Sequence, residues 1–209
     1  MIGNMDYNNF LLRLLFSLVF ISSYLVLAYM NFNYVFYLII LIYFLVFLEL
    51  LKNFKNYQLI PIIYIFISFI FFILIDFNNE IFLTFNLFIF IVITFDIFSY
   101  IVGKIFGKNK LINISPNKTI EGLLGGFICS FILSIIFSYF INKSINLELF
   151  FFVTLIIISA FIGDIIESFY KRKNNLKNSS EFIPGHGGVF DRFDSFLFSI
   201  VIYSVSLQI

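Results

Sequence analysis

Acidic and basic side chains gather between Gly163 and Ser195, although most of this sequence is apolar. At the start of this segment four polar residues recur at i, i+3, i+4 and i+7, so a helix would carry them on one face: Asp164, Glu167, Ser168 and Lys171. Magnesium prefers carboxylate and phosphate oxygens as ligands, and cationic side chains neutralise charge that develops on phosphate. The pattern indicates a magnesium-dependent reaction at a phosphate group.

A glycine-rich turn follows these residues. The run from Pro184 to Gly188 contains one Pro and three Gly, which favour a turn with a backbone that a ligand can approach closely. His186 could cap this turn or contact a phosphate, and one His with one distant Cys makes no zinc ligand set. Two acids then flank a cation at Asp191, Arg192 and Asp194. The alternative to a phosphate site is an ion-pair network that only anchors a loop.

A second polar segment begins inside an apolar run at Asp96. Helical spacing places Asp96 on one stripe with Ser99, Tyr100 and Gly103. A carboxylate in an apolar run usually faces the protein interior or a watery cavity, and the alternative is an acid that reaches for the membrane surface. Gly103 and Gly107 form a GxxxG motif, which favours close helix packing. Because both polar segments follow an acid at the end of an apolar run, we expect them to share one site.

The segment from Ser115 to Gly122 predicts the start of a helix, because Ser115 would be the N-cap and Pro116 the first helical residue. Free amide groups at such a start favour an anion, and Lys118 and Thr119 would add a cation and a hydroxyl. Capping together with a lysine at the membrane surface explains the same residues without a ligand. Three glycines would let a neighbouring helix approach closely: Gly122, Gly125 and Gly126.

The composition is that of a membrane protein. The chain is 61% hydrophobic and 12% charged, whereas a soluble domain has about 25% charged residues. A helix needs roughly 20 apolar residues to cross a bilayer. The sequence predicts about seven such spans, the first of which we expect to be retained because no small-residue cleavage site follows it: Leu14 to Met30, Phe32 to Phe47, Leu59 to Ile75, Ile81 to Val102, Leu123 to Ile141, Leu149 to Ile166 and Phe196 to Leu207.

The placement of charge predicts the topology. If seven spans alternate, 12 of the 13 cationic side chains fall on one side of the membrane and only Lys143 falls on the other. Cationic loops stay in the cytoplasm. We therefore expect an all-α integral membrane protein of the inner (cytoplasmic) membrane, with its amino terminus and two polar loops, Gly103 to Gly122 and Lys171 to Phe193, in the cytoplasm. Residues 1–95 would form amino-terminal spans and residues 96–209 a catalytic core, in one membrane domain without a nucleic-acid partner.

The polar segments resemble the signature of phosphatidate cytidylyltransferases, also called CDP-diacylglycerol synthases. The resemblance rests on Ser168 to Arg172, Lys177, Pro184 to Gly188 and Asp191 to Ser195, and upstream on Asp96 to Tyr100, Gly103 to Lys108 and Ser115 to Gly122. It implies an integral membrane enzyme that condenses CTP with phosphatidate to give CDP-diacylglycerol and pyrophosphate. It also implies Mg²⁺, often assisted by K⁺.

The resemblance further implies roles for individual residues. Asp164 and Asp191 correspond to the family's metal-binding acids, and Glu167, Asp194 and Asn178 would be further ligands or would orient the basic groups. The triphosphate and the phosphatidate head would be held by four cations, Lys171, Arg172, Lys177 and Arg192, with support from Ser168, Lys118, Thr119 and His186. A homodimer could pack through the glycines.

Three departures from the family pattern stand out. Asn178 occupies a position where the family usually has Asp, Lys104 replaces a common Arg, and the chain is shorter than typical members. Related CTP-dependent lipid enzymes remain alternatives, namely a CDP-archaeol synthase or a polyprenol kinase. A further alternative is a transporter or scaffold that uses Asp96 and Asp164 as an ion path.

Overall fold

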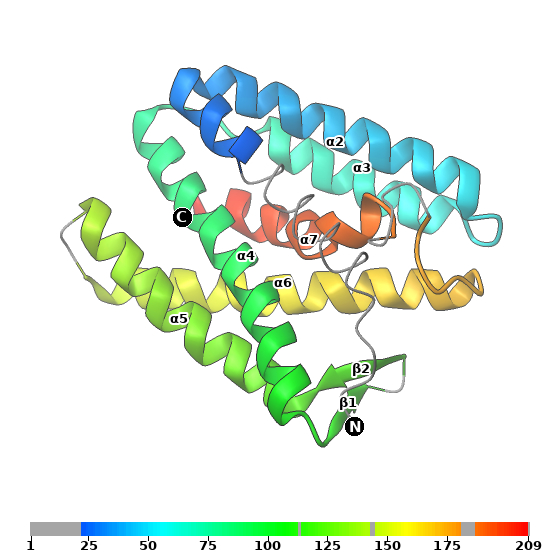
Figure 1. Ribbon diagram of the computed structural model, residues 1–209. Helices are drawn as coiled ribbons and strands as arrows, with labels where there is room; N and C mark the ends of the chain where they lie inside the picture. The colour runs from blue at the N-terminus through cyan, green and yellow to red at the C-terminus, as the bar shows by residue number, and fades with distance from the viewer. Residues whose placement is uncertain (1–21, 113, 143–144, 181–186, 209) are drawn as a thin grey trace. The chain divides into compact units, whose positions relative to one another are not determined.

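The computed structural model describes residues 22–112, 114–142, 145–180 and 187–208 (Figure 1). Residues 22–30 are helical. The further elements are helices α2 (Phe32–Asn53), α3 (Leu59–Ile73), α4 (Asn79–Phe106), α5 (Ile120–Asn142), α6 (Leu147–Lys173) and α7 (Phe190–Ser206), and strands β1 (Lys110–Ile112) and β2 (Ser115–Thr119). The predicted helical fold is confirmed, and the pair of short strands was not predicted.

Within the described ranges, four helices are long and apolar enough to cross a membrane: Phe32–Asn53, Glu80–Phe106, Ile120–Phe140 and Leu147–Lys173. Helix α3 has 15 residues and α7 has 17, fewer than the roughly 20 that a perpendicular span needs. Much of the first predicted span, Leu14 to Met30, lies outside the described residues. The chain is therefore a helical protein with four candidate membrane-spanning helices among its described residues, and the count of seven spans stays a prediction.

Capping residues account for the starts of two of these helices. Asn31 precedes α2, and its side chain accepts a hydrogen bond from the N–H of Asn33 at 3.0 Å. Asn78 precedes α4 and accepts from the N–H of Ile81 at 2.9 Å. Such side-chain acceptors satisfy amide groups that have no partner within the first helical turn. They explain why two apolar runs begin as helices where they do.

The segment from Ser115 to Thr119 corrects one prediction, because it is strand β2 rather than the first turn of a helix. Strands β1 and β2 pair antiparallel, with Lys110 opposite Thr119 and Ile112 opposite Ser115. Helix α5 begins only at Ile120, and Thr119 Oγ1 accepts from the N–H of Gly122 at 3.1 Å. Thr119 is thus the cap, because pairing with β1 satisfies the preceding backbone groups.

Glycines allow α4 and α5 to pack closely, as predicted. A Cβ added at Gly122 would lie 2.9 Å from Gly103 Cα, and one at Gly126 would lie 2.7 Å from Ser99 Cβ. Side chains at these positions would force the two backbones apart. In Figure 1 the hairpin of β1 and β2 connects the end of α4 to the start of α5.

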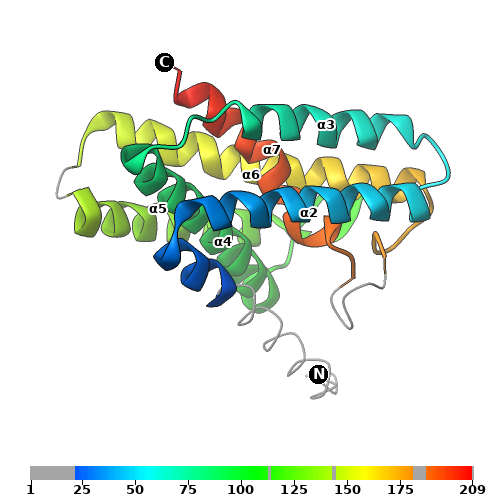
Figure 2. The same cartoon turned by 90° about the horizontal axis from the view of Figure 1, so that it is seen from above.

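The chain divides into two compact units. The first unit comprises Met1–Ile65 and Lys173–Arg192, and the second comprises Phe66–Arg172 and Phe193–Ile209. Residues 95 and 96 both lie within α4, and the predicted division between amino-terminal spans and a catalytic core stays a prediction. In Figure 2 the turn after α2 leads into α3, and α5 and α6 follow one another along the chain.

An aromatic core holds α4 and α7 together in the second unit. The rings of Phe88 and Tyr203 stack with centroids 4.8 Å apart. The hydroxyl of Tyr203 lies 2.9 Å from Thr84 Oγ1 and donates to the carbonyl of Ile81 at 3.2 Å. Buried tyrosines usually find such partners. This packing fixes α7, which carries part of the candidate site.

Candidate functional site

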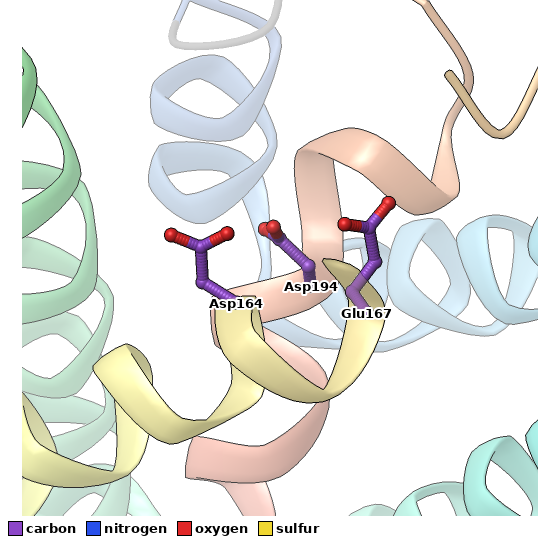
Figure 3. A group of neighbouring side chains, drawn as sticks. All are labelled: Asp164, Glu167 and Asp194. Atoms are coloured by element: carbon purple, nitrogen blue, oxygen red, sulfur yellow. The ribbon is translucent and has the colours of Figure 1, made fainter. Parts of the chain in front are cut away.

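Three acids from two helices of the second unit come together. Asp164 and Glu167 lie on α6 and Asp194 lies on α7 (Figure 3). Each carboxylate offers an oxygen, and these oxygens all lie within 4.8 Å of one another. The i, i+3 spacing of Asp164 and Glu167 puts them on one helical face, as predicted. Within the described residues, the structure thus groups Asp164 with Glu167 and Asp194.

Gly163 permits this meeting of α6 and α7. A Cβ added at Gly163 would lie 2.5 Å from the carbonyl oxygen of Asp194 and 3.2 Å from Ser195 Cα. Real Cβ atoms do not approach a carbonyl oxygen so closely, so only glycine lets the backbone of α7 rest here. The residue beside Asp164 therefore sets the distance between the acids.

Two of the three acids are almost fully buried. Only 1% of the Glu167 side chain and 8% of Asp194 are exposed, whereas the side chain of Asp164 is 30% exposed. Burial, with repulsion from Asp164, Glu167 and Asp96, raises the pKa of the Asp194 carboxyl well above its usual range. Three carboxylates in a confined space are a hard-oxygen donor set, which fits a divalent cation such as Mg²⁺.

Two lysines contact this cluster. Lys118 Nζ lies 2.5 Å from Asp164 Oδ2, and Lys171 Nζ lies 2.7 Å from Glu167 Oε2. Lys118 comes from β2 and Lys171 from one turn further along α6. Both residues were predicted to support phosphate binding, and the structure brings both to the acids. Two of the three acids thus each have a lysine ammonium group within ion-pair distance.

Asp96 also reaches this region, because Ser195 links it to α7. The hydroxyl of Ser195 donates to Asp96 Oδ1 at 3.0 Å, and the backbone N–H of Ser195 donates to Asp194 Oδ1 at 2.8 Å. Asp96 is half-buried. Asp96 thus contacts α7 in the interior of the second unit, as the interior orientation predicts, and its depth in the membrane stays a prediction.

Of three further predicted residues of the second unit, two form hydrogen bonds and one is buried. Thr119 caps α5 through Gly122. Ser168 is buried on α6 with 6% of its surface exposed. Arg172 is exposed, and its Nε donates to the carbonyl of Ile114 beside β2 at 3.1 Å. Arg172 thus ties the end of α6 to the hairpin.

Asp191 lies in the first unit, where backbone amides hold its carboxylate. Oδ2 accepts from the N–H of Ser179 at 3.0 Å and from that of Gly188 at 2.9 Å. Gly187 has a φ of 82°, which side chains rarely adopt. A Cβ at Gly187 would also overlap Asp191 Oδ2. Pro184 to His186 of the predicted turn lie outside the described residues, and Gly187 has a positive φ of the kind that a glycine-rich turn uses.

Glu49, a buried acid of α2, was not predicted as a site residue. Its Oε2 accepts from the N–H of Val189 at 2.7 Å and from that of Phe190 at 3.2 Å. Asn53, one helical turn later, donates from Nδ2 to the carbonyl of Ser179 at 2.8 Å. The end of α2 therefore holds both segments that supply N–H groups to Asp191. The signal was present, since Glu49 interrupts an apolar run just as Asp96 does.

The remaining predicted residues are on or near the surface of the first unit. Lys177 and Asn178 are exposed and line a pocket with Ser179. Arg192 is exposed, and its backbone N–H donates to the carbonyl of Val189 at 3.0 Å. His186 lies outside the described residues.

Several curated proteins that are similar to this chain share one name. A phosphatidate cytidylyltransferase of Staphylococcus haemolyticus (strain JCSC1435) is 47% identical over 112 residues, which cover 52% of this chain and 43% of that protein. Proteins of the same name are 45% identical in Staphylococcus saprophyticus, over 58% of this chain and 48% of that protein, and 46% identical in Staphylococcus aureus (strain COL), over 52% and 43%. The chain spans about half the length of the curated relatives it matches.

The family comparison covers almost the whole sequence. The sequence model of the cytidylyltransferase family matches residues 4–209. This range contains the acid cluster, both lysines that contact it and the amides that hold Asp191. The chain belongs to the cytidylyltransferase family.

Proposed function

We propose that this protein transfers the cytidylyl group of CTP to phosphatidate, producing CDP-diacylglycerol and pyrophosphate. The observation that carries the proposal is the cluster of Asp164, Glu167 and Asp194 with Lys118 and Lys171 in ion-pair contact. The relatives named phosphatidate cytidylyltransferase support the choice of substrates. The reaction belongs to phospholipid synthesis and makes the chain a nucleotidyltransferase.

The reaction needs positioning and charge neutralisation more than a strong base. A phosphate monoester is already an oxyanion at neutral pH, so an oxygen of phosphatidate attacks the α-phosphorus of CTP directly. The new oxygen–phosphorus bond forms as the bond to pyrophosphate breaks, and pyrophosphate leaves with the electron pair. The protein must hold two anions together and stabilise the charge that develops on the leaving group.

The acid cluster is the proposed magnesium site. Asp164, Glu167 and Asp194 would hold the ion, which when bound supplies positive charge to phosphate oxygens and orients them. The pairing of Asp191 with Asp164 around a shared ion stays a prediction, as do a ligand role for Asn178 and the use of K⁺.

Cationic side chains complete the proposed site. Lys118 and Lys171 lie at the acids, where each Nζ can also reach a phosphate oxygen that binds beside them. Arg172, Lys177 and Arg192 would add further positive charge for the triphosphate and the lipid head. Binding of the triphosphate and the lipid head would be supported by Ser168, Thr119 and His186.

The proposed setting is the cytoplasmic membrane, with the site open to cytoplasmic CTP. The four long apolar helices support a membrane location. The concentration of 12 of 13 cationic side chains on one side of the predicted seven spans supports a cytoplasmic amino terminus and cytoplasmic polar loops. A homodimer remains part of the proposal.

The proposal is tested by incubating the purified protein in lipid with labelled CTP, phosphatidate and Mg²⁺. We expect labelled CDP-diacylglycerol. Asp164→Asn should lower the rate by roughly 100-fold or more, because it removes charge from the ion that stabilises the reacting phosphates. The matched control is Glu148→Gln, which removes an exposed acid from the first turn of the same helix and should leave the rate unchanged.

A second measurement separates cation binding from catalysis. Mn²⁺ binding, followed by electron paramagnetic resonance without substrates, should weaken in Asp164→Asn and Asp194→Asn and persist in Glu148→Gln. Absence of CDP-diacylglycerol from folded wild-type protein at every Mg²⁺ concentration would reject the function. A product from an isoprenoid lipid alone would reassign the lipid substrate.

A further inference from the structure

A pocket of about 950 Å³ lies within the first unit, outside the acid cluster. The end of α2 and the segment after α6 form its walls. Its lining includes Leu45, Leu48, Glu49, Lys52, Lys55 and Lys177. This volume suits a ligand much larger than a single phosphate ion.

The pocket changes from apolar to cationic along α2. Leu45 and Leu48 belong to the apolar candidate span, whereas Lys52 lies in its last turn and Lys55 just beyond it. A helix rises about 1.5 Å per residue, so Leu45 and Lys52 are roughly 10 Å apart along the axis. The same change from hydrocarbon to charge occurs across the surface layer of a bilayer.

The pocket carries net positive charge. Its ionisable lining residues are three lysines, at positions 52, 55 and 177, and one acid, Glu49, which sum to +2. The Oε2 atom of Glu49 accepts hydrogen bonds from Val189 and Phe190. Its negative charge is thus turned toward backbone amides, while Lys52, Lys55 and Lys177 are exposed and available to an anion.

We infer that this pocket binds the phosphate head of an anionic phospholipid. The phosphate lies among Lys52, Lys55 and Lys177, and the acyl chains lie against Leu45 and Leu48. Basic pockets at the cytoplasmic ends of membrane helices recognise lipid heads in this way. The identity of the lipid as phosphatidate rests on the proposed function, whereas the anionic head and apolar chains follow from the pocket itself.

The lining favours a lipid over a nucleotide. Among the described lining residues there is no aromatic side chain on which a cytosine ring could stack. Four lining residues are instead aliphatic, namely Leu45, Leu48, Leu176 and Val189. They offer an apolar surface that CTP does not need and that acyl chains do.

The test is a binding measurement with the double variant Lys52→Gln, Lys55→Gln. Dihexanoyl phosphatidate is titrated calorimetrically into the whole protein in a neutral detergent. We expect affinity to fall about 30-fold, since each lysine near a lipid head contributes about 1 kcal/mol. The matched control is Lys108→Gln, Lys110→Gln, which removes two exposed lysines of the second unit and should not change the affinity.

Three other ligands identify what the pocket recognises. Glycerol 3-phosphate has the phosphate without chains, and dihexanoyl phosphatidylcholine has the chains without net charge, so both should bind wild-type protein at least tenfold more weakly. Mg²⁺–CTP should bind the wild type and the Lys52→Gln, Lys55→Gln variant equally. The inference is overturned if the wild type and the double variant bind phosphatidate with equal affinity. It is also overturned if the double variant loses affinity only for Mg²⁺–CTP.

The outcome is independent of the proposed function. If phosphatidate binds through Lys52 and Lys55 but wild-type protein makes no CDP-diacylglycerol, the lipid pocket stands and the proposed reaction fails. If CDP-diacylglycerol forms while the double variant keeps both its phosphatidate affinity and its KM for phosphatidate, the pocket assignment fails and the reaction stands.

Discussion

At the scale of single residues, Glu49 holds backbone amides near Asp191. It accepts from the N–H groups of Val189 and Phe190, and only 7% of its surface is exposed. An N–H group that loses its buried acceptor costs about 1–3 kcal/mol. Glu49 therefore determines the conformation of the turn whose Gly188 amide binds Asp191.

This role predicts different results for two substitutions. Glu49→Gln keeps a side-chain oxygen acceptor and should retain slow hydrogen exchange at the amides of Val189 and Phe190. Glu49→Ala removes the acceptor and should speed exchange at both amides about 5- to 150-fold, the equivalent of about 1–3 kcal/mol. Hydrogen exchange read by mass spectrometry measures the difference.

The control for Glu49 is Glu148→Ala, a change at an exposed acid that should leave exchange at residues 189 and 190 unaltered. Equal protection in Glu49→Gln and Glu49→Ala would mean that the carboxylate does not hold this turn.

At the scale of elements, the contact of α6 with α7 determines the separation of the acids. Gly163→Ala adds a Cβ 2.5 Å from the carbonyl oxygen of Asp194, and such overpacking typically costs about 1–3 kcal/mol. We expect α7 to shift from α6, with weaker Mn²⁺ binding and a lower unfolding temperature. Ile162→Ala, at the neighbouring and partly exposed residue, should keep Mn²⁺ affinity. Unchanged affinity in Gly163→Ala would show that this contact does not position the cluster.

The elements also show what local sequence patterns can predict. The shared face of Asp164, Glu167 and Lys171 followed from helical spacing, which depends only on nearby residues. Strand β2 could not be predicted from local spacing, because Ser115 and Pro116 satisfy the local rules for a helix start. Pairing with β1 decided the outcome, and that pairing depends on residues 110–112. Lys118 on β2 was nevertheless predicted as a phosphate-binding cation, since its charge is the same in a strand and in a helix.

At the scale of the whole molecule, the distribution of lysines predicts which polar segments face the cytoplasm. In a Cys129→Ser background, which removes the sole cysteine of the sequence, Lys110→Cys places a single thiol on β1, before α5, and Ile145→Cys places one just after α5. We expect a membrane-impermeant maleimide to label residue 145 in intact cells and residue 110 only after permeabilisation. The reverse labelling pattern would invert the proposed topology.

The long-range parts of the site were beyond prediction from the sequence. Composition predicted the membrane class, and spacing predicted the acids and cations. The meeting of Asp194 with Asp164 depends on one glycine contact between helices, and the role of Glu49 depends on amides 140 residues away. Neither contact produces a local sequence pattern, so neither could be predicted from the sequence.

The first unit joins two stretches that the ribosome makes at different times. Glu49 precedes Val189 by 140 residues, and at about 5–20 residues per second their synthesis is separated by roughly 7 to 28 s. Throughout that interval, nascent α2 carries a carboxylate whose final amide partners do not yet exist. Water or the insertion machinery must solvate it meanwhile, so the maturation of the first unit waits until residues 189 and 190 have been synthesised.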